Sequence, residues 1–337
     1  MIGMGIIGCG SIVRVRHAPE CALNENVEIK GFYNPTEKRA EEMIVTYGGK
    51  VYKTIDELLE DRDIEAVIIA APNRFHGDLA VRALEAGKHV LCEKPCVISR
   101  GELKQLRAAV NHSETIFMAA QNQRFEPVHI EAKRLLKKGE IGEIISVFLE
   151  FSHGGPEKWS IQGEKNWFLD KDISGLGVLG DLGIHKIDLL RWILEEDIIA
   201  VTADLNNFCR KNRDGEALNI DDHALCRMET KGGKTAVILA SWCNYGICRN
   251  WMMVYGTKGT MLVDLEAKSK QIQIHRGVNN IIEEYSCKDS GKIVDVFVDG
   301  IVKGISPVGI DEVEKDMEVI FGAYESSKTK KKIYLGG

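Results

Sequence analysis

The stretch GIIGCGSIV at residues 5–13 decides the fold of this chain. The apolar run Met4–Ile7 predicts a short buried strand, and a glycine turn and then a helical pattern follow it directly. Gly8 permits a tight turn there and Gly10 lets a diphosphate approach the backbone, while the first N–H groups of the helix bind the phosphates. The strand, turn and helix together predict a dinucleotide-binding Rossmann domain.

The residue after the second predicted strand, Val27–Tyr33, bears on the choice between NAD and NADP. NAD enzymes place an acid there, about twenty residues past the glycines, where it binds the adenosine ribose. This chain has Asn34, whose amide can bond a ribose hydroxyl but does not repel a 2'-phosphate. Lys38 and Arg39 on the next predicted helix either pair with such a phosphate or form a solvated helix face. The sequence therefore does not decide between NAD and NADP.

Strands and helices then alternate, which is typical of a doubly wound parallel sheet and of an α/β fold. The further strands expected are Ala66–Ala71, His89–Cys92 and Thr115–Ala119, and the helices between and beside them are Asp56–Leu59, Phe75–Glu85 and Arg100–Asn111.

Two loops leave the carboxyl ends of these strands and are expected to face the cofactor. They are Ala71-Pro72-Asn73 and Cys92-Glu93-Lys94-Pro95. Lys94 is the important member, because a lysine beside a nicotinamide can donate a hydrogen bond to a reacting oxygen. The alternative is an ordinary surface charge.

A second stretch, GVLGDLGIHKIDLLRW at residues 177–192, predicts a glycine-rich entry into an apolar helix. Asp181 and His185 stand four residues apart and share one helix face. An imidazole titrates near pH ~6.5, so His185 is a suitable proton carrier. The alternative is a buried helix in which the two side chains only satisfy each other.

Size and composition favour two domains in a globular protein, because 337 residues are too many for one ordinary core. A net charge of −6 and the lack of a basic stripe with interleaved aromatics argue against a nucleic-acid partner. No apolar run approaches the ~20 residues of a membrane span, and the chain enters a strand without a charged leader. Nine irregularly spaced cysteines do not form a disulfide framework, so we expect a reducing, cytoplasmic setting.

No metal site is expected from the sequence. The pairs Cys92/Cys96 and Cys243/Cys248 lack zinc spacing with matching partners. Asp221-Asp222-His223 are adjacent in an extended segment, so their side chains should point to opposite faces.

The motifs GIIGCGSI (5–12), APNRFH (71–76), ALEAGKHVLCEKP (83–95) and the stretch at 177–192 resemble the glucose-fructose oxidoreductase / inositol dehydrogenase / MocA family over essentially the whole chain. This resemblance implies a Rossmann domain followed by an α/β domain with a large open antiparallel sheet. It also implies hydride exchange between a nicotinamide cofactor and a sugar, polyol or related hydroxyl compound. Val13, at the third glycine position, and Asn34 depart from the commonest family pattern, and Val13 should push helix and strand slightly apart.

The resemblance and the residue patterns together give the candidate site. The resemblance assigns the catalytic roles to Lys94, to His185 as the proton carrier and to Asp181 as its helix partner. The candidate cofactor-binding residues are Gly8, Cys9, Gly10, Ser11, Ile12, Asn34, Lys38, Arg39, Ala71, Pro72, Asn73, His76, Glu93 and Lys94. The candidate substrate residues are Arg124, His153, Trp167 and Tyr245, and Arg124 alternatively forms an interdomain salt bridge.

The domain boundary is expected near Gln121–Arg124, which gives a cofactor domain at 1–121 and a substrate-binding and oligomerisation domain at 122–337. The long aromatic loop His153–Asp170 should shape a pocket or form an oligomer contact. The later part of the chain predicts the helices Pro127–Lys138 and Val313–Ser326 and the strands Ile144–Phe151, Ile199–Leu205, Ala224–Glu229, Thr235–Trp242, Trp251–Tyr255, Met261–Leu265, Gln271–Ile274 and Ile333–Leu335.

The free face of this antiparallel sheet could pair with a second copy, which favours a homodimer or homotetramer. The expected reaction is reversible oxidation of a secondary alcohol with NAD or NADP. Two other functions stay open from the sequence, a non-catalytic dinucleotide-sensing regulator and a glycosidase that uses NAD for a transient oxidation. The identity of the sugar or polyol is not encoded in any motif.

Overall fold

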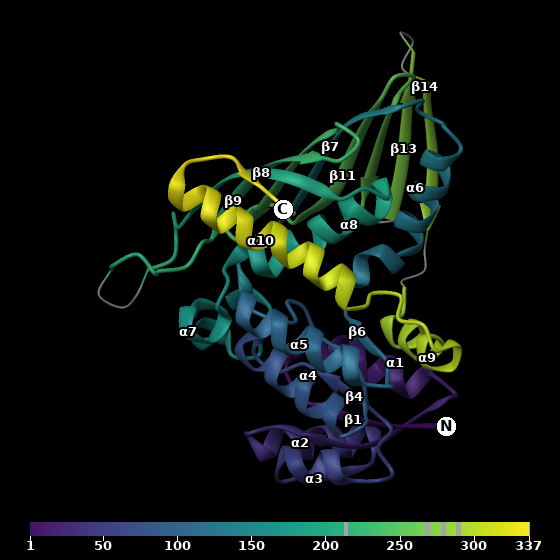
Figure 1. Ribbon diagram of the computed structural model, residues 1–337, viewed down its shortest axis with the longest axis vertical. Coiled ribbons are helices and arrows are strands. Elements are labelled where there is room, and N and C mark those ends of the chain that lie inside the picture. Colours follow the sequence, from purple (N-terminus) through teal and green to yellow (C-terminus); the bar gives the residue numbers. More distant parts are fainter. Residues whose placement is uncertain (212–214, 267–269, 278–280, 288–290, 337) are drawn as a thin grey trace. The chain divides into compact units, whose positions relative to one another are not determined.

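The computed structural model of the chain describes residues 1–211, 215–266, 270–277, 281–287 and 291–336, and these form two compact units (Figure 1). The first unit contains Met1–Gln121, Trp159–Gly175 and Lys292–Glu314. The second contains Asn122–Lys158, Leu176–Gly291 and Lys315–Gly337. The chain therefore returns twice to the first unit with segments that the sequence analysis assigned to the second domain.

The first unit is built on a six-stranded parallel sheet with the strand order β3-β2-β1-β4-β5-β6. The chain adds β2 and β3 on one side of β1, and then crosses over to add β4, β5 and β6 on the other side, as in dinucleotide-binding folds. This topology confirms the predicted doubly wound α/β architecture. Its strands are β1 (Ile2–Ile7), β2 (Val27–Tyr33), β3 (Lys50–Tyr52), β4 (Ala66–Ile69), β5 (His89–Cys92) and β6 (Phe117–Ala119).

Helices from both early and late segments complete this unit. They are α1 (Ala18–Leu23), α2 (Glu37–Tyr47), α3 (Ile55–Glu60), α4 (His76–Glu85), α5 (Arg100–His112), α7 (Lys171–Ser174) and α9 (Ile293–Lys303). The late helix α9 is tied to α1, because Glu20 accepts a hydrogen bond from the Val294 N–H over 3.0 Å. Asn24 also donates to Asp295 over 2.7 Å.

A wider helical turn begins at the third position of the glycine motif. Val13 is completely buried and opens a π-helical turn, η1 (Val13–His17), ahead of α1. A π-turn adds a residue to each hydrogen-bonded ring, and such turns are frequent at functional sites.

The second unit is built on a nine-stranded sheet with the order β14-β13-β12-β11-β7-β10-β9-β8-β15. Its neighbouring strands are antiparallel except for β7 and β10, which pair in parallel, so the predicted large open sheet is mixed and mostly antiparallel. The strands are β7 (Ile144–Ser152), β8 (Ile198–Asn206), β9 (His223–Thr230), β10 (Thr235–Ser241), β11 (Arg249–Gly256), β12 (Thr260–Asp264), β13 (Lys270–Arg276), β14 (Ile281–Cys287) and β15 (Ile333–Tyr334).

Helices cover one face of this sheet (Figure 1). They are α6 (Pro127–Lys137), the π-helical turn η7 (Leu179–Gly183) with α8 (Ile184–Leu194), and the part of α10 (Ile310–Thr329) that belongs to this unit. Alternate strand residues such as Val147, Leu149 and Ile238 are buried beneath them. Short 3-10 turns occur at η2 (Asn73–Phe75), η3 (Asn122–Phe125), η4 (Pro156–Lys158), η5 (Gly163–Lys165) and η6 (Trp167–Leu169).

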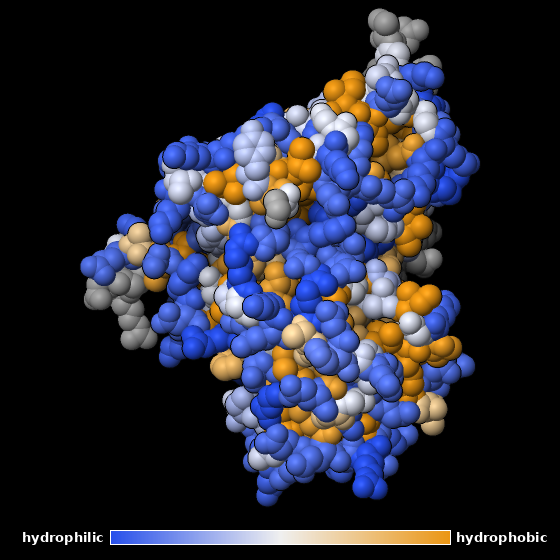
Figure 2. Space-filling view, in the orientation of Figure 1, coloured by the Kyte–Doolittle hydropathy of each residue, from blue (hydrophilic) through white to orange (hydrophobic). Residues whose placement is uncertain are grey.

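Within the described ranges, the helices are all too short or too polar to cross a membrane. Hydrophilic residues cover most of the face shown in Figure 2, and hydrophobic residues form smaller groups between them.

Candidate active site

The glycine turn of the first unit has the geometry that a dinucleotide needs. Gly8 has a φ of +100°, and a Cβ at this position would meet the Ala70 carbonyl oxygen at 2.4 Å, so only glycine fits. At Gly10 a Cβ would meet nothing within 4 Å, which leaves space beside the backbone. The binding of a diphosphate at this turn stays a prediction.

Asn34 follows β2 and braces this turn. Its side-chain oxygen accepts the Cys9 N–H over 3.1 Å, and its NH₂ group donates to the Thr36 carbonyl over 2.9 Å. Arg39 lies close enough to act on the same turn: burial raises the pKa of the Cys9 thiol to about 12, while the charges of Arg14 and Arg39 oppose that rise. Lys38 is exposed on the first turn of α2.

His76 joins the two strand-end loops of the first unit. One ring nitrogen lies 2.8 Å from the Pro95 carbonyl oxygen and the other lies 2.6 Å from the Ala71 carbonyl oxygen. The ring is 1% exposed. Burial lowers the pKa of His76, so the neutral ring donates its one N–H to one of these carbonyls and lies beside the other, and Asn73 donates to the Ser174 carbonyl over 3.0 Å.

Glu93 holds a negative charge next to Lys94. Burial acts to raise the pKa of Glu93, but a 2.8 Å contact from the buried His17 ring and the charges of His17, Lys94 and His76 outweigh it, so the pKa lies below the usual value. The second carboxylate oxygen accepts the Lys94 N–H over 3.1 Å. The backbone that carries Lys94 is thereby fixed by an ionised neighbour.

Ser11 of the glycine turn is bound to a late segment of the same unit. Its hydroxyl donates to the Trp159 carbonyl over 3.4 Å and accepts the Ile161 N–H over 3.1 Å. In that segment the Trp167 ring stacks on Phe168 at 3.8 Å. The aromatic loop singled out in the sequence is thus attached to the turn that the cofactor needs.

In the second unit, the helix that carries Asp181 and His185 is braced at its N-terminus. Asp221 accepts the Val178 N–H through its carbonyl over 2.9 Å and the Leu179 N–H through its carboxylate over 3.0 Å. A Cβ at Gly177 would meet the Asp221 carbonyl oxygen at 2.3 Å, so the close approach requires glycine. The Tyr324 hydroxyl donates to Asp221 over 2.6 Å and accepts the Gly177 N–H over 2.8 Å.

Asp181 and His185 are both nearly buried, at 4% and 8% exposure. The Asp181 carboxylate accepts the indole N–H of Trp242 over 3.2 Å. The His185 ring lies 5.9 Å from the ring of Phe151, measured between centroids. The role of Asp181 in orienting His185 stays a prediction.

His153 and Tyr245 lie on loops at the ends of strands of the second unit. The His153 ring is 6.0 Å from the Phe151 ring, so His153 and His185 share Phe151 as a neighbour. Tyr245 is 65% exposed, and its hydroxyl accepts a hydrogen bond from Arg210 over 3.1 Å.

Arg124 is engaged inside the second unit. Its guanidinium binds Asp188 with two nitrogens, one of them over 2.9 Å, and its side chain is 4% exposed. Burial raises the pKa of Asp188 and of the nearby Asp316, which pairs with Arg191 over 2.6 Å. This geometry favours a structural ion pair over a substrate contact, and the pair lies within one unit instead of joining two domains.

Lys186 is a buried lysine that the sequence analysis passed over. Its ammonium nitrogen lies 3.0 Å from the Gln123 side-chain oxygen and 2.6 Å from that of Asn250. Burial lowers the pKa of Lys186 to about 7. Above this pH the amine is mostly neutral and still has two N–H donors, one for each of these acceptors.

The bracing residues Asp221, Trp242 and Tyr324 were missed because each lies far from residues 177–192 in the sequence. Among these residues, only Asp221 stood in a stretch that the sequence singled out, Asp221-Asp222-His223. The three side chains of that stretch point to different partners. Asp221 braces the helix, Asp222 binds the backbone of residues 208–210, and His223 contacts Ser241 over 3.1 Å.

Comparison with known proteins decides the family. The model of the oxidoreductase family with an NAD-binding Rossmann fold matches residues 2–121, and that of the GFO/IDH/MocA C-terminal domain matches residues 129–262. The chain is 32% identical over 246 residues to glucose-6-phosphate 3-dehydrogenase of Bacillus subtilis strain 168, which covers 72% of this chain and 68% of that protein. The chain belongs to the GFO/IDH/MocA oxidoreductase family.

A further relative and a solved structure are also similar to this chain. Inositol 2-dehydrogenase of Rhizobium meliloti strain 1021 is 28% identical over 264 residues, or 78% of this chain and 76% of that protein. The structure of levoglucosan dehydrogenase in complex with NADH and levoglucosan superimposes with a TM-score of 0.89 over 100% of both chains. Its sequence identity is 21%, so this likeness concerns the fold. The protein is a nicotinamide-dependent oxidoreductase of this family, and residues 2–121 of its first unit are the NAD-binding Rossmann domain.

Proposed function

We propose that the protein catalyses reversible oxidation of a secondary hydroxyl of a sugar, a polyol or a sugar derivative. Two relatives support this substrate class, since they are named for dehydrogenation of glucose 6-phosphate and of inositol. The observation that carries the proposal is the buried, braced helix that presents Asp181 and His185. A frame of this kind is expected where a proton must be moved at a defined position.

In this proposal His185 accepts the hydroxyl proton of the substrate. Phe151 packs near one side of the His185 ring and limits its freedom. Asp181 stabilises the charged ring after it accepts the proton, and Trp242 holds the Asp181 carboxylate. General acid-base catalysis of this kind contributes ~10² to 10⁴ in rate.

Lys94 binds the substrate oxygen that changes between hydroxyl and carbonyl. A compact ammonium donates a hydrogen bond and favours the negative charge that develops on that oxygen. Glu93 keeps the backbone of Lys94 in place through the Lys94 N–H.

The glycine turn, Asn34 and the loops braced by His76 would hold the cofactor, through the candidate residues named above. When bound, the nicotinamide supplies hydride transfer. Asn34 has an amide where a carboxylate would repel a 2'-phosphate, and Arg39 lies near the turn, so we propose that both NAD and NADP are accepted.

His153 and Tyr245 are proposed as substrate contacts, with Trp167 excluding water. Arg124 is left out of this set, because Asp188 engages its guanidinium. We propose a reducing, cytoplasmic setting for the enzyme, which fits the free cysteines of the described chain.

We also propose that two copies associate through the face of the nine-stranded sheet that carries no helices. Phe148 and Tyr255 are exposed on β7 and β11 and stack edge to face at 5.6 Å, and Leu225 is exposed on β9. Exposed apolar patches of this kind mark association surfaces. Light scattering during size-exclusion chromatography tests this, and a monomer mass at micromolar concentration would contradict it.

A screen of polyols, aldoses and sugar acids against NAD and NADP tests the proposed reaction, read by the absorbance of the reduced nicotinamide. We expect at least one substrate to reduce cofactor in step with its own oxidation. Hydrolysis of a glycoside without net cofactor reduction would favour the glycosidase alternative. Cofactor binding without turnover on every compound would favour the regulator.

A further inference from the structure

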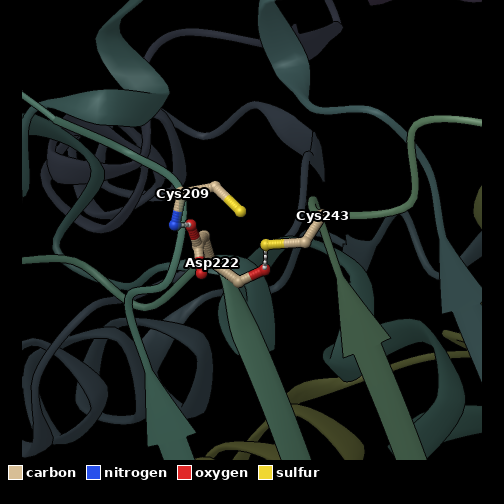
Figure 3. A group of neighbouring side chains, drawn as sticks. All are labelled: Cys209, Asp222 and Cys243. Atoms are coloured by element: carbon tan, nitrogen blue, oxygen red, sulfur yellow. Dashed lines mark hydrogen bonds between the residues drawn. The ribbon is translucent and has the colours of Figure 1, made fainter.

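Two cysteines and an aspartate that are distant in the sequence meet in the second unit (Figure 3). Cys209 follows β8, Asp222 precedes β9, and Cys243 follows β10. The two sulfur atoms and a carboxylate oxygen of Asp222 all lie within 4.8 Å of one another. Cys243 is close in the sequence to Cys248 only, so this group, the cysteine cluster, was not expected from the sequence.

Hydrogen bonds fix the loop that carries Cys209. The buried Asp222 carboxylate accepts the N–H groups of Phe208 over 2.9 Å, Cys209 over 2.7 Å and Arg210 over 3.1 Å. The Asn207 side chain donates to the carbonyls of residues 210 and 218, over 2.9 Å and 2.6 Å. The backbone of Cys209 is therefore held in one place.

The Cys243 side is fixed to the same aspartate. Trp242 donates its backbone N–H to the Asp222 carbonyl over 2.8 Å, and the Cys243 thiol donates to that carbonyl over 3.6 Å. The Cys243 N–H donates to the Ser241 hydroxyl over 3.0 Å. Asp222 thus positions both thiols, one through its side chain and the other through its backbone.

The two thiols differ in reactivity. Cys209 is exposed, whereas Cys243 is partly buried. Burial, together with hydrogen bonds to Cys209 and Asp222, raises the pKa of Cys243 to about 12. Arg210 brings a guanidinium nitrogen to 4.0 Å from the Cys243 sulfur and favours negative charge on sulfur. Cys209 is the accessible partner for an oxidant, and Cys243 is the protonated thiol beside it.

Two thiols and a carboxylate at this distance could alternatively bind a metal cation. The Asp222 oxygens already accept three backbone N–H groups. The guanidinium of Arg210 lies 4.0 Å from the Asp222 carboxylate and equally near the Cys243 sulfur, so a cation would meet a positive charge. These contacts favour thiol chemistry over metal ligation.

We propose that Cys209 and Cys243 are a thiol modification site that forms a reversible intramolecular disulfide on exposure to a peroxide. The Cys209 thiolate attacks one peroxide oxygen and becomes a sulfenic acid, with release of hydroxide, which takes up a proton as water. The Cys243 thiol then gives up its proton as its sulfur attacks the Cys209 sulfur, the S–O bond breaks, and the hydroxyl takes up that proton and leaves as water. The thiol pair loses two electrons and hydrogen peroxide is reduced to two waters.

The disulfide would tie the loop at residues 207–211 to the segment that begins at Trp242 and carries Tyr245. These are neighbours already, since Arg210 donates to the Tyr245 hydroxyl over 3.1 Å. This inference goes beyond the proposed function, because the bond can form whatever substrate the enzyme takes. Because the bond limits local opening of the two loops, we expect slower proteolysis of both in the oxidised protein.

Peptide mapping of the full-length protein tests the proposal. After treatment with hydrogen peroxide and alkylation of the remaining thiols, trypsin releases peptide 192–210 with Cys209 and peptide 235–249 with both Cys243 and Cys248. We expect these two peptides to be joined, with the loss of two hydrogens, and to separate after treatment with dithiothreitol. Because peptide 235–249 has two cysteines, the variant Cys248→Ser assigns the bond.

The link should persist in Cys248→Ser and disappear in Cys209→Ser and in Cys243→Ser. All three variants are conservative, and circular dichroism spectra like that of the wild type show that they fold. A link that disappears in Cys248→Ser would overturn the assignment. So would direct oxidation of Cys209 to sulfinic acid with no linked peptide. Stoichiometric binding of zinc chloride that requires both thiols, together with resistance to peroxide, would show a cation site instead.

Discussion

The indole N–H of Trp242 donates to the carboxylate of Asp181 over 3.2 Å, from the end of β10 to the turn before α8. Trp242 is completely buried. The sheet therefore positions an acid that stands one helical turn from His185, while Asp221 and Tyr324 position the start of the same helix.

Removing this indole donor should lower activity more than it lowers cofactor affinity. Trp242→Phe keeps an aromatic ring but leaves a buried carboxylate without its N–H partner, which costs about 1–3 kcal/mol. We expect turnover to fall about tenfold, in line with ~1.4 kcal/mol of lost positioning. Steady-state kinetics beside cofactor titration measures this. Trp251→Phe is the matched control, since Trp251 donates to Glu150 over 2.9 Å on β11, and an equal loss in both variants would contradict a special role for Trp242.

Arginine should not be able to replace Lys94. Lys94→Ala is expected to reduce turnover and substrate affinity together, because the ammonium serves both ground state and transition state. Lys94→Arg should not restore activity, since a planar fork cannot replace a compact point charge. Rates of cofactor reduction measure both variants, and a fully active Lys94→Arg protein would make the lysine a simple counter-charge.

Asn34→Asp should shift the cofactor preference towards NAD. The new carboxylate can accept ribose hydroxyl bonds worth about 1.5–3 kcal/mol, and it repels a 2'-phosphate. It also loses the donor to the Thr36 carbonyl, but that cost is shared by both cofactors and cancels in the ratio. Tryptophan-fluorescence titrations give the two dissociation constants. An unchanged ratio of the two constants would show that residue 34 does not contact the ribose. If Arg39 reaches the 2'-phosphate, Arg39→Ala should weaken the binding of NADP and leave that of NAD unchanged.

Lys186 should make stability depend on pH. Its pKa falls from the usual 10.5 to about 7 on folding, so between these values the unfolded chain binds one more proton than the folded chain. Stability then rises with pH by up to about 1.4 kcal/mol per unit in that window. Below the folded pKa this gain is absent.

Urea unfolding near pH 7.5 and near pH 9 measures the effect. The wild type should gain up to ~2 kcal/mol relative to Lys186→Met over this interval, whatever absolute stability the variant loses. Lys303→Met, at an exposed lysine of α9, is the control and should follow the wild type. Parallel curves for wild type and Lys186→Met would show that Lys186 keeps its proton state on folding.

Much of the fold could be predicted from local patterns, because β1, β4, β5 and β6 of the first unit are short, mostly apolar runs bounded by turn signals, whereas the three-residue strand β3 was not predicted. β2 and β5 begin and end at the predicted residues, and the ends of α3, α4, α5 and α6 shift by one residue at most. Helix α10 is three residues longer at each end than predicted, and α9 and β14 were not predicted. The parallel pairing of β7 with β10 was not predicted, since strand periodicity indicates which face is buried and carries no information about the direction of the partner.

The candidate site was less accessible to sequence reasoning, because its supports come from long-range contacts. Arg124 stood where the family resemblance suggests a substrate contact, yet a buried aspartate on α8 engages it. The same α8 carries Lys186 between two amide acceptors from η3 and β11. No spacing rule pairs such residues; only the folded chain brings them together.

Turnover of His185→Ala on the best substrate of the screen, measured with saturating cofactor, tests the central claim most directly. If His185 accepts the proton that accompanies each hydride transfer, its loss should lower turnover by about 10² to 10⁴ while the dissociation constant of the cofactor barely changes. Near wild-type turnover in His185→Ala would remove His185 from the mechanism.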